Sequence, residues 1–120
     1  MVMVGTNLWV GDNSGCKKVR CIKVLGNSKK ANVGDCLIVS VTKANPKKKI
    51  KEHEVRRVLL IRSKTRTFRS NGLIVYFLKN VVLLVDARCN PIGTRILGSV
   101  TKELRKKNLM KIVSMSSSVI

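Results

Sequence analysis

The residues whose types could carry out chemistry are few, and their spacing forms no recognisable reactive set. The four cysteines contain no C-x-x-C pair, and His53 alone could complement them, which argues against a zinc site because zinc ligands usually come in close pairs. The six acidic residues are scattered, and no pair is typical of a general acid and base. We therefore expect no catalytic residue, no metal and no cofactor, and a protein that is not an enzyme.

The cysteines have a structural interpretation instead. Cys21 and Cys36 lie inside apolar runs, where small buried thiols are common, so we expect reduced, buried cysteines rather than a disulfide framework. His53 lies between two glutamates, and we expect it in a solvated loop. A thiol-dependent enzyme is the alternative, and it would require one cysteine with a lowered pKa.

The charge balance points to a polyanionic partner. The 120 residues carry 25 Lys and Arg against 6 Asp and Glu, a formal net charge of +19. A net charge of about 2–8 suffices to keep a small domain soluble, so this excess indicates nucleic acid rather than a solvated surface. A membrane partner fits poorly: no apolar run approaches the ~18 residues that span a bilayer, and no long basic amphipathic helix is present.

The scarcity of aromatic residues favours recognition of RNA phosphates and shape over the reading of unstacked bases. Aromatic residues make up 3% of the chain, and among them Phe68, flanked by basic residues, is the plausible stacking residue. Phe77 lies in an apolar run, and we expect it in the core. Phosphate contacts position a protein without reading sequence, so binding should depend steeply on salt.

Short β-rich runs separated by turn residues must position these charges. The runs predict strands over the ranges 19–25, 36–42, 55–62, 73–77 and 81–85, with a further early strand near 8–10. Five or more short strands suggest one domain over residues 1–120, a mainly β fold built as a small closed barrel. One helix is predicted over 101–108, and we expect the polar tail 114–118 to fray.

Seven short blocks follow one another along nearly the whole chain. They are residues 12–15, 19–26 and 33–35, the Asn71-Gly72 turn with Phe77 and Asn80, and residues 91–96, 103–105 and 110–112. In order and spacing they resemble the universal large-ribosomal-subunit protein fourteen family of bacterial and organellar type. Each block alone is weak, whereas the set is very specific.

The resemblance implies a five-stranded barrel of the OB/SH3-like kind with a short C-terminal helical segment, and a structural role in the large ribosomal subunit. It implies binding to large-subunit rRNA, contact with neighbouring large-subunit proteins, and bridges to small-subunit rRNA. The residues expected to bind rRNA are Asn13, Ser14, Lys17, Lys18, Arg20, Lys23, Lys29, Lys30, Lys47, Lys48, Lys49, Lys51, Arg66 and Arg69.

A second surface, facing the small subunit, is implied at Thr94, Arg95, Arg105 and Lys111, where a ribosome-silencing factor is a further expected partner. Thr94 has an alternative role in shaping the turn after Gly93. The Lys- and Asn-rich loops, the absence of an import signal and the divergent tail suit an organelle-encoded mitochondrial protein, with a plastid or the bacterial cytoplasm as alternatives. A free-standing RNA-binding translation or assembly factor on a similar barrel is the competing function.

Overall fold

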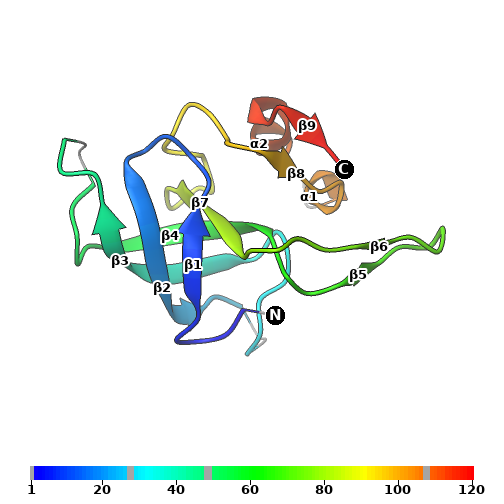
Figure 1. Ribbon diagram of the computed structural model, residues 1–120, viewed down its shortest axis with the longest axis horizontal. Helices are drawn as coiled ribbons and strands as arrows, with labels where there is room; N and C mark the ends of the chain where they lie inside the picture. The colour runs from blue at the N-terminus through cyan, green and yellow to red at the C-terminus, as the bar shows by residue number, and fades with distance from the viewer. Residues whose placement is uncertain (1, 27–28, 48–49, 107–108) are drawn as a thin grey trace.

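Five strands form a closed barrel, in the order β1-β2-β3-β4-β7 (Figure 1). The computed structural model describes residues 2–26, 29–47, 50–106 and 109–120. The barrel strands are β1 (Asn7–Val10), β2 (Cys16–Val24), β3 (Cys36–Ala44), β4 (Val55–Arg62) and β7 (Val81–Val85). Neighbouring strands are antiparallel except β1 and β7, which pair in parallel and close the barrel. The predicted fold class is confirmed.

Two strands are apolar on both faces because they separate two cores. Successive side chains of a strand point to opposite faces, and on β4 and β7 one set, including Val58 and Leu84, fills the barrel interior. The other set, including Leu59 and Leu83, packs against a second cluster. That cluster includes Leu104 and Ile112 from the C-terminal segment, so this segment covers the outer face of the barrel at β4 and β7.

The C-terminal segment is more ordered than the sequence indicated. Helix α1 (Glu103–Lys106) lies within the predicted range, but a second helix, α2 (Met110–Met115), was not predicted. The tail 114–118, expected to fray, begins inside α2 and ends in β9 (Ser118–Val119), which pairs in parallel with β8 (Ser99–Val100). Burial of Ile112 and Val113 gives α2 the apolar contacts that a short helix needs.

The apolar run at 73–77 is not a barrel strand, which corrects the prediction. Only β6 (Ile74–Val75) forms there, and it pairs with β5 (Thr67–Phe68) in a two-stranded ribbon that projects from the barrel (Figure 1). Leu73 and Ile74 are exposed, and Phe77, expected in the core, is half-buried. The early strand β1 takes the fifth place in the barrel, between β2 and β7.

Candidate nucleic-acid interface

The outer face of β2 carries a row of exposed cations. Cys16, Val19, Cys21 and Val24 of this strand are buried, and the lysines and arginine between them point outward. Irregularities in the pairing of β2 with β3 break strict alternation, which lets adjacent basic residues share the outer side. Lys17, Arg20 and Lys23 are exposed, whereas Lys18 is half-buried.

The loops that flank this strand extend the basic surface. Lys29 and Lys30 precede β3 and are exposed, as are Lys47 and Lys51 in the segment between β3 and β4. The backbone amide of Lys47 donates to Asn45 Oδ1 at 3.0 Å, which fixes the start of that loop. Lys48 and Lys49, which the sequence analysis placed among the RNA contacts, lie outside the described residues.

Five of the six acidic residues form contacts within the described part of the protein and offer little opposition to this surface: Asp12, Asp35, Glu54, Asp86 and Glu103. Within the described residues two ion pairs form, Arg56 with Glu54 and Arg69 with Glu103. Asp12 is buried and accepts from the backbone amide of Leu84. Most of the cations therefore lack an acidic partner inside the protein, and a phosphate backbone would supply the missing charge.

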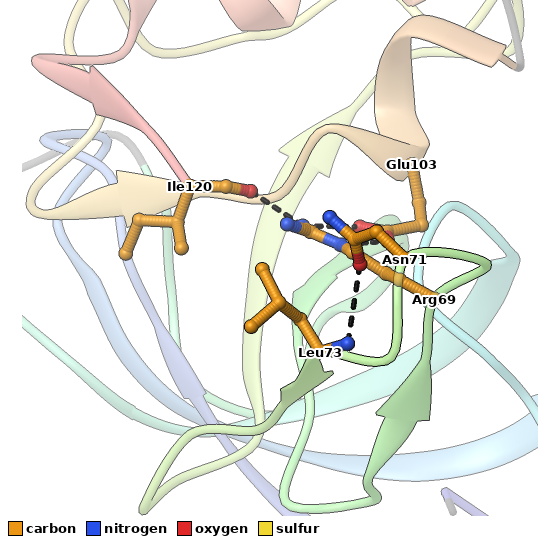
Figure 2. Close-up of polar contacts among 5 residues, drawn as sticks. All are labelled: Arg69, Asn71, Leu73, Glu103 and Ile120. Atoms are coloured by element: carbon orange, nitrogen blue, oxygen red, sulfur yellow. Dashed lines mark hydrogen bonds and ion pairs between the residues drawn. The ribbon is translucent and has the colours of Figure 1, made fainter.

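The two arginines of the projecting ribbon have different environments. Arg66 is exposed, with its guanidinium 5.8 Å from the centroid of the Tyr76 ring. Arg69 instead donates to both carboxylate oxygens of Glu103, at 3.0 and 3.4 Å, and to the backbone oxygen of Ile120 at 2.5 Å (Figure 2). Its guanidinium joins the ribbon to α1 and β9, so the geometry gives Arg69 a structural contact where the sequence suggested a phosphate contact.

The Glu103 carboxylate is ionised in this pair. Partial burial alone would raise the pKa of Glu103, but hydrogen bonds, with that from Arg69 the strongest, outweigh burial and lower the pKa below its ordinary value of 4.5. Close by, the Asn71 side chain accepts from the backbone amide of Leu73 at 3.1 Å and shapes the ribbon's tip (Figure 2). Gly72, in this turn, has φ of 88°, a value that favours glycine.

Asn13 and Ser14 hold the protein's own backbone. Asn13 donates to Thr94 Oγ1 at 2.9 Å and accepts from the backbone amides of Thr94 and Arg95, at 3.0 and 3.3 Å. Ser14 donates to Asp12 Oδ1 at 2.5 Å. A Cβ on Gly93 would lie 2.9 Å from Asn13 Oδ1, so this turn packs closely against the loop after β1.

The predicted subunit-facing residues lie on the segment that follows β7. Thr94 and Arg95 are exposed, and Asn13, 81 residues away along the chain, fixes their backbone. Arg105 of α1 and Lys111 of α2 are also exposed, on two helices that pack together. The structure thus links the first pair through Asn13 and places the second pair on the C-terminal segment.

The four cysteines are free thiols, but the burial expected for Cys21 and Cys36 holds only for Cys21. Cys16 and Cys21 are buried, while Cys36 and Cys89 are half-buried with their sulfur atoms 3.5 Å apart. Burial raises the pKa of the Cys16 thiol to about 11, and burial together with the contact to Cys89 does the same for Cys36. A raised pKa keeps these thiols protonated at neutral pH, the opposite of an activated nucleophile.

The described residues contain no group of three or more His, Cys, Asp or Glu side chains that could hold a metal ion. They also contain no helix of the length and apolarity needed to cross a membrane.

Sequence reasoning missed one cluster, formed by Trp9, Lys18 and Lys79. The two lysine Nζ atoms lie 4.3 and 4.4 Å from the centroid of the Trp9 ring. Trp9 and Lys18 are opposite each other in the β1–β2 pairing, and Lys79 lies two residues before β7, the strand that pairs with β1 on its other side. Only the strand register brings these residues together, so the sequence carried no signal for the cluster.

The barrel, the ribbon and the C-terminal segment agree with the resemblance carried by the sequence motifs. Residues 1–120 match the protein family described as Ribosomal protein L14p/L23e. The match extends over the whole chain and includes every motif block named above. The chain belongs to this family, whose members are structural proteins of the large ribosomal subunit.

Proposed function

We propose that this chain binds large-subunit rRNA through the cations on the outer face of β2 and the adjoining loops. The observation that supports this proposal is a row of exposed cations on one strand of a protein with a net charge of +19: Lys17, Arg20 and Lys23. Most of the described acidic residues already form contacts inside the protein. An approaching phosphate is therefore the group that can neutralise these cations. Contacts of this kind hold the fold in place on RNA without reading its sequence.

The test is a filter-binding titration of an rRNA fragment over a range of salt concentrations. Replacing one phosphate-binding side chain should lower the slope of log K against log salt by roughly 1. We expect that loss for Lys17→Ala and Arg20→Ala. Lys17→Arg keeps the charge and serves as the matched control. Unchanged slopes in both alanine variants would remove β2 from the interface.

We also propose that Thr94, Arg95, Arg105 and Lys111 face the small subunit and contact its rRNA across a bridge. Support comes from the Asn13 side chain, which holds the backbone of Thr94 and Arg95 while both residues remain exposed. A ribosome-silencing factor would dock on the same surface. Light-scattering measurement of subunit association with the Arg95→Ala variant tests the bridge, and loss of factor binding without loss of association would separate the two roles.

We propose a mitochondrial ribosome as the place where the chain acts, with a plastid or bacterial ribosome as the alternative. The support is compositional: Lys- and Asn-rich loops around a Val, Ile and Leu core. Sucrose-gradient fractionation of purified organelles at moderate salt should place the chain in the large-subunit peak. Recovery mainly in fractions free of ribosomes would favour a free-standing RNA-binding factor.

A further inference from the structure

A groove beside β1 belongs to none of the surfaces proposed above. It lies where the chain returns from the ribbon and enters β7, next to β1, and it has a volume of about 480 Å³. That volume is within the range of small-ligand sites. Its lining includes Trp9, Gly11, Arg62, Phe77, Leu78 and Lys79.

The Trp9 ring forms an exposed wall of this groove. Its neighbour Leu8 points into the barrel, so Trp9 points outward, and 41% of its surface is exposed. A large aromatic residue exposed to this degree on a barrel strand contributes little to the core. The ammonium groups of Lys18 and Lys79 lie close to the ring, which combines a flat apolar surface with two mobile positive charges.

Arg62 adds a fixed cation to the same groove. Its Nη2 donates to the backbone oxygen of Leu97 at 2.8 Å, and its buried Nε has no hydrogen-bond partner among the described residues. Two glycines make room for the guanidinium: a Cβ on Gly98 would lie 2.6 Å from Nη1, and one on Gly11 would lie 3.2 Å from Nη2. The arginine is therefore built into the groove, and a ligand with acceptor atoms would relieve its incomplete hydrogen bonding.

The lining defines the chemistry of the occupant. None of the described residues that line the groove is acidic, while Arg62 and Lys79 contribute positive charge and Trp9, Phe77 and Leu78 contribute apolar surface. A ligand that matches must combine a flat ring with negative charge. A nucleotide does so, whereas an acidic peptide would satisfy the charges without needing an open aromatic ring.

We propose that this groove binds one unstacked nucleotide of RNA, with its base against Trp9 and its phosphate facing Lys18 and Lys79. The inference rests on the proposed rRNA binding and adds to it a contact that reads single-stranded RNA. Without RNA the lysines lie on the ring. When a base stacks there, an ammonium group exchanges the weak contact with the ring for a stronger one with phosphate.

Trp9 is the one tryptophan in the sequence, so its fluorescence reports on this groove directly. We would titrate the full chain with a four-nucleotide single-stranded oligoadenylate at low salt. Stacking should quench the emission. The variants at this position lack the tryptophan, so their affinity is measured from the fluorescence anisotropy of a dye-labelled oligonucleotide. By this measurement Trp9→Leu should weaken binding about 10-fold, the scale of one base–aromatic stack. Trp9→Phe keeps a ring and should retain most of the affinity. Tyr76→Leu, which removes an exposed aromatic of the ribbon, is the matched control and should change nothing.

Each outcome decides a different question. If the oligonucleotide does not quench the emission while a large rRNA fragment still binds, the inference that the groove binds a nucleotide is overturned. The proposed function would then still stand. Equal quenching by a polyglutamate peptide would assign the groove to an acidic protein segment and would also overturn the inference. Failure to bind any RNA at low salt would refute the proposed function itself. If Trp9→Leu does not fold, the presence or absence of quenching in the unmodified chain still decides the result.

Discussion

The ion pair between Arg69 and Glu103 should contribute measurably to stability, and its size follows from its environment. The two side chains are 15% and 21% exposed and share two hydrogen bonds. A charge-assisted hydrogen bond in such a setting contributes about 1.5–3 kcal/mol, more than a solvated pair. We expect a coupling energy of about 1.5 kcal/mol between Arg69→Ala and Glu103→Ala in a double-mutant cycle. Glu103→Ala alone should lower Tm by about 6 °C.

The chain offers its own control for this cycle. Arg56 and Glu54 form the same kind of pair at 2.9 Å, but their side chains are 34% and 31% exposed. A pair so solvated is typically worth about 0.2–1 kcal/mol. Both cycles would be measured by urea unfolding, followed by circular dichroism, at pH 7 and a fixed salt concentration. A coupling for Arg69 and Glu103 no larger than that of the control pair would refute the reasoning from burial.

Acid supplies a second test of the same pair. Because the pKa of Glu103 is lowered in the folded protein, its contribution is fully present above its unfolded value of 4.5 and is lost as the pH falls through the lowered folded value. The coupling energy should therefore be constant between pH 6 and pH 7, in a range well above both values, and should shrink as the pH falls below about 4.5. A coupling that stays constant into strong acid would show that the carboxylate charge is not its source.

Three further predictions follow from the structure. Arg66→Ala should lower the salt slope of rRNA binding by roughly 1 and leave stability unchanged, whereas Arg69→Ala should lower stability and leave the slope unchanged. Filter binding measures the slope and urea unfolding measures the stability, and the reverse pattern would contradict the assignment. Between pH 9 and pH 11, the free energy of unfolding should fall by about 2 kcal/mol more in the unmodified protein than in Cys16→Ala, because burial raises the pKa of this thiol from 9.0 to about 11. Equal slopes in the two proteins would contradict this prediction. Asn13→Ala should increase amide hydrogen exchange at Thr94 and Arg95 at least tenfold, since their amides lose an acceptor, while the core strands stay protected; unchanged exchange would show that Asn13 does not hold the turn.

The strands that the sequence predicted best are those with apolar runs covered on both faces. The predicted ranges 55–62 and 81–85 match β4 and β7, because these strands separate two cores: β7 is apolar throughout, and β4 carries a buried apolar run over 58–61. The run at 73–77 has the same composition but lies in the ribbon, with Leu73 exposed. Hydrophobicity alone does not say whether a run is covered by its own fold or by a partner, and this is why the prediction was wrong.

The basic character of the site could be predicted from the sequence, but the contacts between its residues could not. Net charge and motif order identified the basic surface, because these quantities do not depend on the fold. The contact of Asn13 with Thr94 joins residues 81 positions apart, and the cluster around Trp9 depends on strand register. Likewise, nothing local distinguishes Arg66 from Arg69; the difference arises because Glu103 comes to lie beside the second of them. Contacts of this long range become visible only once the strands are paired.

The parallel pairing of β1 with β7 imposes an order on folding. A parallel pair of strands cannot form a hairpin, so the edge of β1 that β7 covers stays unpaired until Val81–Val85 has been synthesised. Until then the nascent chain exposes a strand edge that invites aggregation, and closure across such a separation is slow. Dense positive charge on the neighbouring strand β2 would repel a second nascent chain during that interval. The lysines proposed to bind RNA phosphates would therefore also reduce aggregation of the chain before it meets the RNA.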